Sequence, residues 1–217
     1  MRLALTRFSG IAPKQTDYNL QGRVQGVTDI SLNAAGLAQA DAAAPIIAAY
    51  KPVKIIASPL ERAQQTAQAL AKLSGGKVAS DERLIERSFG IWEGLTGKEI
   101  KAGWPQEFKL WRGKCGTPGG IGMEERDAVG QRSAAAMRDA VEALGTDDTV
   151  VAVAHSAVLT MGATCLLGLD PNSWSGLLSL GNCAWGVLHN GLRPPGWAIR
   201  QWNVSVTDSS NATPAIW

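Results

Sequence analysis

Apolar runs of strand length alternate with longer helix-forming stretches along this chain, and this alternation constrains its fold most strongly. Strands are expected at residues 2–6, 53–57 and 149–154, with a closing pair at 183–189 and 197–203. Helices are expected between them, at residues 36–50, 58–73, 124–144 and 157–167. This order is typical of a mostly parallel sheet that is flanked by helices. The sequence therefore predicts an α/β fold of three layers.

Proline and serine positions predict where the helices begin and bend. Pro45 falls inside the alanine-rich stretch, so we expect a kink or a break there. Ser58 is the expected N-cap of the next helix, and Pro59 its first residue, where a missing N–H costs nothing.

Residues 86–122 are rich in Gly, Trp and Pro and show weak periodicity. We expect one domain of 217 residues with a lid or insertion in this segment.

The charge balance and the cysteine content argue against several classes of protein. With 21 basic and 19 acidic side chains the net charge is +2, which does not suit a broad nucleic-acid surface. The three cysteines match no metal-binding spacing, and no apolar run reaches the length of a membrane span. The N-terminus is charged too early for a signal peptide. We expect a cytoplasmic protein without metal, cofactor, nucleic-acid or membrane partner, and leave a homodimer open.

Polar side chains follow three of the expected strands directly. They are Arg7 and Ser9, on either side of Phe8, after the first strand, Arg62 after the second, and His155 and Ser156 after the strand at 149–154. Because ligands bind beyond the carboxyl ends of parallel strands, we expect the arginines and the histidine to converge at one edge of the sheet. Guanidinium groups bind phosphate and carboxylate oxygens through paired hydrogen bonds. The sequence therefore predicts a site for a small anionic molecule.

Four segments, in order along the chain, resemble the signatures of one family. They are QGRVQG at 21–26 with the residues that follow it, ASPLERAQQTA at 57–67, ERSFGIWEGLT at 86–96, and VAVAHS at 151–156. In these segments the chain is similar to the phosphoglycerate mutase-like proteins of the histidine phosphatase superfamily. One such match alone is weak, but four matches in the family's order over most of the chain are specific.

The resemblance implies a phosphoglycerate mutase-like fold and a hydrolase or an isomerase that transfers a phosphoryl group through a phosphohistidine. In the family the histidine of an Arg-His-Gly motif attacks phosphorus, two arginines and a second histidine hold the phosphoryl oxygens, and a carboxyl protonates the leaving oxygen. Carried over by position, Arg7 and Arg62 match the arginines. His155 then matches the second histidine and Glu86 the acid.

The resemblance places Phe8 at the position of the nucleophile, and a phenyl ring has no lone pair or proton with which to act. Ser9 and Ser156 stand where the two histidine motifs have glycine. We therefore expect a divergent active site with Glu86 and His155 as catalytic residues, and with a substrate-binding set of Arg7, Phe8, Ser9, Arg62 and Ser156. Three functions stay open: an enzyme with altered chemistry, a non-catalytic binding or regulatory protein, and a weak phosphomonoesterase that uses His155 or water.

Each candidate residue also has a purely structural interpretation. Arginines serve as ion-pair partners, histidines pack in cores, glutamates stand in solvated loops, and serines occupy turns. A serine nucleophile with His155 as its base is a further alternative, although no spacing demands it. Phe8 is either an apolar filler or a wall for an apolar part of the substrate. The eight tryptophans either pack the core and the lid or line a pocket.

Overall fold

A sheet of six strands, in the order β3-β2-β4-β1-β5-β6, forms the centre of the described part of the chain. The computed structural model describes the backbone of residues 6–11, 15–113, 116–142, 144–145, 147–191 and 193–206, and the same residues' side chains except 6–9 and 11. The strands are β1 (Thr6–Ile11), β2 (Lys54–Ala57), β3 (Val78–Ser80), β4 (Thr149–Val153), β5 (Trp185–Asn190) and β6 (Trp197–Val204). Within this sheet β5 alone runs in the direction opposite to the other strands, which confirms a mostly parallel arrangement.

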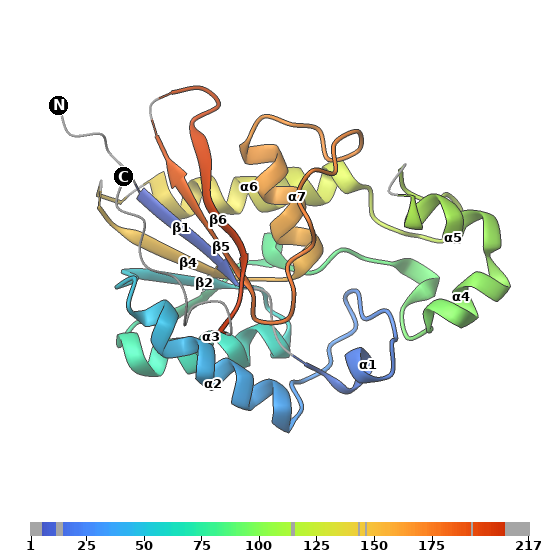
Figure 1. Cartoon of the computed structure of the whole chain (residues 1–217), viewed down its shortest axis with the longest axis horizontal. Helices are drawn as coiled ribbons and strands as arrows, with labels where there is room; N and C mark the ends of the chain where they lie inside the picture. The colour runs from blue at the N-terminus through green and yellow to red at the C-terminus, as the bar shows by residue number, and fades with distance from the viewer. Residues whose placement is uncertain are drawn as a thin grey trace.

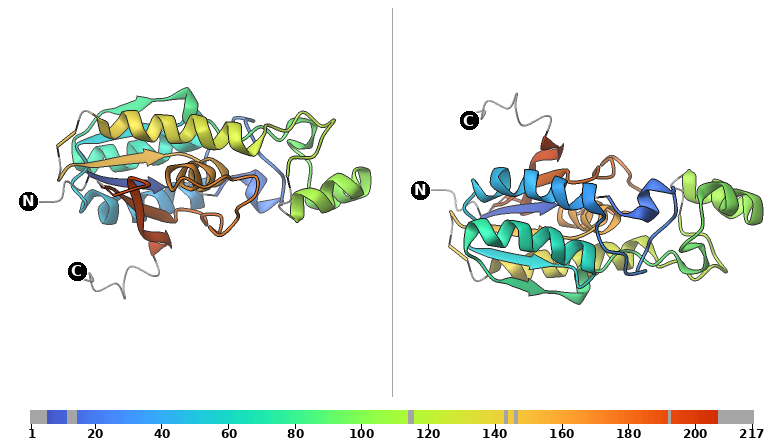
Figure 2. Two further views of the ribbon diagram at one scale, coloured as in Figure 1. Left: turned by 90° about the horizontal axis from the view of Figure 1, so that it is seen from above. Right: turned by 90° about the horizontal axis from the view of Figure 1, so that it is seen from below.

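Helices cover both faces of the sheet (Figures 1 and 2). One face carries α2 (Ala34–Ala48) and α3 (Glu61–Ser74), and the other carries α6 (Arg126–Glu142) and α7 (Ser156–Leu166). Three shorter helices, α1 (Asp17–Leu20), α4 (Gly97–Gly103) and α5 (Pro105–Arg112), lie beyond the carboxyl ends of the parallel strands. The three predicted layers are therefore present. No helix in the described residues combines the length and the apolar character that a membrane span requires.

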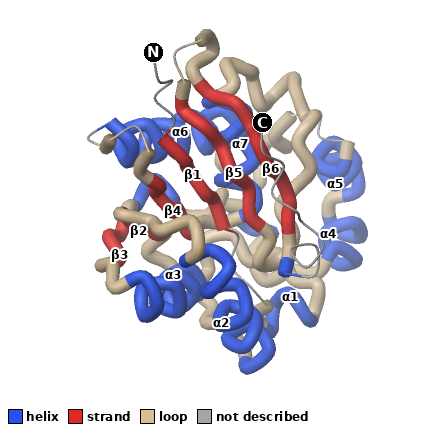
Figure 3. The backbone as a smooth tube through the Cα atoms, turned by 60° about the vertical axis from the view of Figure 1, so that its left-hand side comes forward, coloured by secondary structure: helices blue, strands red, loops and turns tan. Residues whose placement is uncertain are grey.

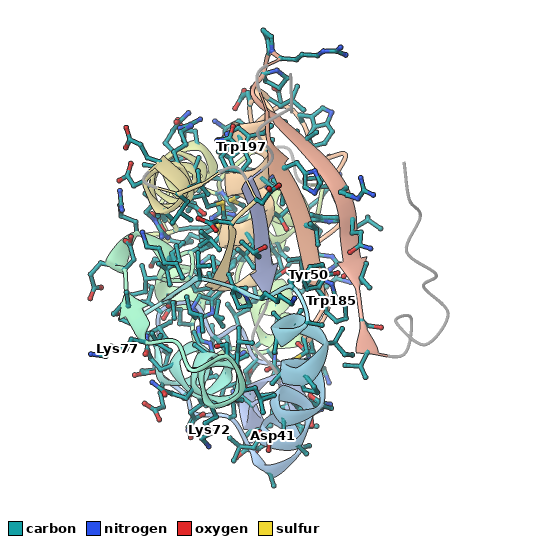
Figure 4. The ribbon with its side chains drawn as sticks, turned by 90° about the vertical axis from the view of Figure 1, so that its left-hand side faces the viewer. Asp41, Tyr50, Lys72, Lys77, Trp185 and Trp197 are labelled. Carbon is teal, nitrogen blue, oxygen red and sulfur yellow. The ribbon has the colours of Figure 1, made fainter. Side chains whose placement is uncertain are left out.

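The alternation of side chains along β4 explains why both faces are covered. Val150 and Ala152 pack against α6 and α7, whereas Val151 and Val153 face α2 and α3. A strand that is buried on both faces has a continuous apolar sequence, which is why this segment was predictable. Figure 4 shows Tyr50, which follows α2, beside Trp185 of β5.

The position of the first strand differs from the prediction. β1 runs from Thr6 to Ile11 instead of ending at residue 6, and the predicted residues 2–5 lie outside the described residues. Arg7, Phe8 and Ser9 are therefore inside a strand and do not follow its end. The physical reason is pairing on both sides, because β1 lies between β4 and β5 (Figure 3) and its backbone groups bond to both neighbours. Pairing on both sides extends the strand over polar residues, which a search for apolar runs in the sequence does not include.

Two predictions about helices were also wrong, namely a break at Pro45 and an N-cap at Ser58, while a kink at Pro45 stays a prediction. α2 continues through Pro45, whose carbonyl accepts a hydrogen bond from Ala49 N–H at 3.1 Å. Pro45 has no N–H to donate to the carbonyl of Asp41. Both residues are exposed, so water can solvate that carbonyl. α3 begins at Glu61 with Leu60 as its N-cap, and Ser58 does not cap it.

The segment predicted to be a lid holds α4, α5 and a short 3₁₀ turn, Gly90–Trp92. It has its own apolar cluster, in which Trp92 and Ile100 are fully buried. Trp111 packs edge-on against Trp92, with ring centroids 5.7 Å apart. Figure 1 shows α4 and α5 set apart from the sheet. Aromatic packing therefore holds this segment together, and its role as an insertion or a lid stays a prediction.

Candidate active site

A cavity of about 230 Å³ lies at the edge of the sheet where β2 and β4 end. Arg62, Glu86, His155 and Ser156 line it together, so the structure brings four of the predicted site residues to one place. We call this space the edge cavity. Its wall also contains polar side chains that the sequence analysis did not select, namely Asn19, Arg23, Gln25 and Asn182. Arg23 and Gln25 stand in the segment at 21–26 that carries the family resemblance, whereas Asn19 and Asn182 reach the cavity only through the fold.

His155 follows β4 directly and is the N-cap of α7. Its side chain is only 3% exposed, and its Nε2 lies 2.7 Å from Ser58 Oγ in a hydrogen bond whose donor depends on the tautomer. Burial, and then the nearby charges of Arg62 and Arg132, hold the pKa of His155 well below its ordinary value. The imidazole is therefore neutral at neutral pH, and Ser58 orients it.

Arg62 lies in the first turn of α3 and is 3% exposed. Its Nη1 and Nη2 donate to the carbonyls of Thr28 and Gly26 at 2.9 and 2.8 Å. Burial lowers its pKa, and the charges of Glu86 and two other carboxylates oppose that effect. No carboxylate in the described residues lies within ion-pair distance of Arg62, so the guanidinium is a positive charge held in place by backbone oxygens.

Glu93 holds the loop that in turn holds Arg62. Its carboxylate accepts hydrogen bonds from the backbone N–H groups of Val27, Thr28 and Phe89 and from the Thr28 hydroxyl, at 2.8 to 3.2 Å. Sequence reasoning did not single out Glu93, although it stands in the segment at 86–96 that carries the family resemblance. We conclude that Glu93 is a positioning residue for the Arg62 side of the cavity.

Glu86 stands in the wall of the edge cavity beside the start of α7. Its carboxyl group accepts backbone hydrogen bonds from Arg87, at 2.8 Å, and from Val158. Burial raises the pKa of Glu86, while those hydrogen bonds and the charges of Arg62 and Arg132 act in the opposite direction. An arginine nearby would by itself keep this group ionised, but burial outweighs that charge. A carboxyl that retains its proton to higher pH suits a proton donor.

Arg132 of α6 holds the backbone on which Glu86 stands. Its guanidinium donates to the carbonyls of Arg83 and Ile85 at 2.7 Å and to that of Glu86 at 3.2 Å. It also forms an ion pair with Glu124 at 2.8 Å. The segment before Glu86 is therefore tied to α6 at several points, which positions the carboxyl.

Ser156 is the first residue of α7. Its hydroxyl oxygen is enclosed and has no hydrogen-bond partner in the described residues. Among those residues, no group of three or more His, Cys, Asp or Glu side chains is placed to hold a metal ion. The arrangement thus offers an arginine, a neutral histidine, a carboxyl of raised pKa and the positive end of a helix, which together suit an oxyanion.

The register of the sheet locates the remaining predicted residues. Phe8 lies opposite Val150, and Ile11 lies opposite Val153, two residues before His155. A strand rises roughly 3.3 Å per residue, so the backbone of Phe8 lies about 16 Å before that of His155 along the strand direction. The side chains of Arg7, Phe8 and Ser9 lie outside the described residues, as do residues 12–14, so contact of these three with a ligand stays a prediction.

The sequence contains two histidines, and only one of them lines the edge cavity. His189 lies in β5 opposite Arg7, toward the start of β1 and away from the carboxyl edge. No histidine precedes His155 in the sequence, and residues 12–14 after β1 are Ala-Pro-Lys. No histidine therefore lies on the first strand or in the residues that directly follow it, whichever residue is aligned with the family's nucleophile.

A family model described as the histidine phosphatase superfamily, branch 1, matches residues 15–205. The chain belongs to this superfamily. The matched region starts after β1, so Arg7, Phe8 and Ser9 lie outside it, whereas Arg62, Glu86 and His155 lie inside it. The fold and family expected from the four signature segments are thus confirmed.

Curated relatives and solved structures include phosphatases of similar length. The chain is 36% identical over 208 residues to a glucosyl-3-phosphoglycerate phosphatase of Mycolicibacterium vanbaalenii, an alignment that covers 88% of this chain and 91% of the relative. It is 28% identical to phosphoserine phosphatase 1 of Hydrogenobacter thermophilus, covering 81% of this chain and 82% of that protein. A solved mycobacterial glucosyl-3-phosphoglycerate phosphatase in complex with VO3 superposes with a TM-score of 0.83 at 34% identity, over 92% of this chain and 99% of that one.

Proposed function

We propose that this protein binds a small phosphorylated molecule in the edge cavity and acts on it without forming a phosphohistidine at the family's usual position. The single observation that carries the proposal is the placement of the histidines, because His155 alone lines the cavity and none precedes it in the sequence. Groups suited to binding and protonating a phosphate ester line the same cavity and support the proposal, namely Arg62, Glu86 and the N-terminus of α7.

Each group has a role that follows from its surroundings. Arg62, whose orientation is held by two carbonyls, binds phosphoryl oxygens together with the start of α7. Water attacks phosphorus and forms the new P–O bond, and its proton passes to the neutral imidazole of His155. The ester P–O bond breaks, and Glu86 gives its proton to the leaving oxygen. Without a positioned nucleophile, we expect turnover several orders of magnitude below that of a phosphohistidine enzyme.

A labelling experiment tests the absence of a phosphohistidine. Intact protein is incubated with a ³²P-labelled phosphodonor and then divided between acid and alkaline treatment. We expect no acid-labile label, since His155 is the one histidine that lines the cavity and its Nε2 is hydrogen-bonded to Ser58. Acid-labile phosphate on the wild-type protein that disappears in His155→Ala would overturn the proposal and identify His155 as the nucleophile.

A Glu86→Gln substitution tests the proton donor. We expect hydrolysis of alkyl phosphates to fall by about 10²- to 10⁴-fold, because general acid catalysis is worth that much, whereas hydrolysis of p-nitrophenyl phosphate, whose leaving group needs no proton, falls far less. Because burial raises the pKa of Glu86, activity toward alkyl phosphates should decline as pH rises through that pKa. Equal losses on both substrates would argue against a proton-donor role. Glu142→Gln, at an exposed position of α6, is the control.

A binding protein without turnover is the second candidate, and the missing histidine favours it too. Thermal-shift measurements with phosphate esters, combined with product analysis, separate the two candidates. Stabilisation by esters with no product over long incubation would support binding alone. Product formation that Glu86→Gln abolishes would support the enzyme.

A further inference from the structure

Ser58 and His155 meet where two neighbouring strands end. Ser58 directly follows β2, His155 stands two residues after β4, and the register of the two strands pairs Ala57 with Val153. Ser58 Oγ and His155 Nε2 lie 2.7 Å apart, and the two residues are 0% and 3% exposed. The side chain of Ser58 does not cap α3, as the sequence had predicted. Its contact with His155 is therefore the interaction whose consequence for the reaction matters.

Three hydrogen bonds hold Ser58 in place besides the one to His155. Its N–H donates to the carbonyl of Val153 at 2.9 Å, and its carbonyl accepts from Gln64 Nε2 at 2.6 Å. Its Oγ accepts from the N–H of Leu60 at 3.4 Å. Because backbone and side chain are both tied to the ends of neighbouring elements, the hydroxyl oxygen has a fixed position. A fixed partner for Nε2 in turn fixes the orientation of the imidazole ring.

The ring of His155 has one nitrogen left for a molecule in the edge cavity. Nε2 is engaged by Ser58, which is not part of the wall of that cavity. His155 is the N-cap residue of α7, yet its side chain makes no capping hydrogen bond to the helix. Among the described residues nothing is hydrogen-bonded to Nδ1. Because His155 itself lines the edge cavity, Nδ1 is the ring nitrogen that a bound molecule or its attacking water can reach.

Two positive groups act on the cavity side of this ring. Arg62 lines the same cavity, and its charge acts on His155. The N-terminus of α7, which is the positive end of the helix dipole, begins directly after His155. A neutral imidazole carries its hydrogen on one nitrogen and a lone pair on the other, and nearby positive charge favours the lone pair on the side that faces it. These groups therefore favour a bare Nδ1 toward the cavity and a hydrogen on Nε2 toward Ser58.

We infer that Ser58 is a positioning residue, which keeps the hydrogen of neutral His155 on Nε2 and so makes Nδ1 the base of the reaction. This inference rests on the proposed function, in which His155 takes a proton from the attacking water. That proton passes to Nδ1, while Nε2–H stays hydrogen-bonded to Ser58 Oγ. The bond then has a charged donor, and such bonds are roughly twice as strong as neutral ones. Ser58 thus stabilises the imidazolium as it forms.

NMR of the full chain labelled with ¹⁵N-histidine measures the tautomer, because the sequence contains only two histidines. The signals that are lost in His155→Gln belong to His155. We expect the Nε2–H form in the wild-type protein and a mixture of both neutral forms in Ser58→Ala. Ser133→Ala is the control, since it removes another fully buried hydroxyl, one without a hydrogen-bond partner in the described residues, and should leave the tautomer unchanged. A hydrogen on Nδ1 in the wild type, or an unchanged tautomer in Ser58→Ala, would overturn the inference.

Steady-state kinetics with p-nitrophenyl phosphate distinguish positioning from a general loss of structure. The leaving group of this substrate needs no proton, so its hydrolysis reports the base and not the acid. We expect Ser58→Ala to lower kcat by about 10- to 100-fold, the range for a hydrogen bond to a charged group. The Kd of inorganic phosphate should stay within about twofold of wild type. An unchanged kcat, or equal losses in kcat and in phosphate affinity, would contradict a positioning role.

A second variant covers the case in which Ser58→Ala does not fold by circular dichroism. Ser58→Cys then replaces it, because a thiol has a similar shape but is a weaker acceptor, and the same changes are expected in smaller measure. The outcomes also separate this inference from the proposed function. If the wild type turns over no phosphate ester, the proposed enzyme fails, and the base role of Nδ1 fails with it. If turnover is present but the hydrogen lies on Nδ1, the role of Ser58 alone is overturned.

Discussion

At the scale of single residues, the site depends on a chain of contacts that ends at a glycine. Gly26 has a φ of +55°, and its carbonyl accepts from Arg62 Nη2. A Cβ at this position would collide with the carboxylate of Glu93, the group that holds the same loop. The loop therefore needs glycine both for its backbone conformation and for space.

Gly26→Ala and Gly22→Ala form a matched pair that separates these two requirements. Gly22 has a φ of +65°, and a methyl group at this position would have no atom within 4 Å, so its substitution reports the backbone strain alone. We expect Gly26→Ala to lower the free energy of unfolding by at least about 1 kcal/mol more than Gly22→Ala, and to weaken phosphate binding. Urea titration and isothermal titration measure the two effects. Equal losses in both variants would show that Glu93 moves aside without cost.

The buried imidazole predicts a pH dependence of stability. The pKa of His155 lies well below the ordinary 6.5 in the folded protein and returns to it on unfolding. Between these values the unfolded chain binds more protons, so the free energy of unfolding falls as pH drops below about 6.5, by up to roughly 1.4 kcal/mol per pH unit. Above that pH, His155 does not make the free energy of unfolding depend on pH. Urea titrations from pH 7.5 to 5 should show a smaller decline in His155→Gln than in wild type, and an unchanged decline would contradict neutral burial.

At the scale of elements, α6 does more than cover the sheet. Arg132 ties this helix to the segment before Glu86 through three carbonyls and an ion pair. Polar contacts of this kind connect a helix to a loop whose own periodicity is weak. The helix thereby controls the placement of the proposed proton donor.

Arg132→Met should destabilise the protein by about 2–4 kcal/mol, because it leaves Glu124 and several carbonyls without their partner in a partly buried place. Arg138→Met changes an exposed residue of the same helix and should stay within about 0.5 kcal/mol of wild type. Chemical unfolding monitored by tryptophan fluorescence measures both. A loss below about 1 kcal/mol in Arg132→Met would show that the loop is held mainly by apolar packing.

At the scale of the whole molecule, the sequence predicted those parts whose signals are local. β4 and α7 were recognised because a continuous apolar run and a following helix occupy neighbouring residues. The extent of β1 was not recognised, because it is set by pairing with two strands more than 130 residues away in the chain. Ser58 was assigned to a helix cap by its neighbours, whereas the fold places its hydroxyl against His155. The tryptophans divide between both interpretations, since Trp185 is core while Trp111 and Trp174 line cavities.

The sequence by itself determined the family, the three-layer fold and the lack of a histidine before His155, because signature segments and residue identity do not depend on folding. The tertiary structure decided which side chains share a cavity, that burial makes His155 neutral and raises the pKa of Glu86, and that Arg87 and Arg126 line a second cavity with no ion-pair partner among the described residues. The physical reason is that desolvation and charge pairing depend on distances between residues far apart in the chain. No local pattern of residues encodes those distances.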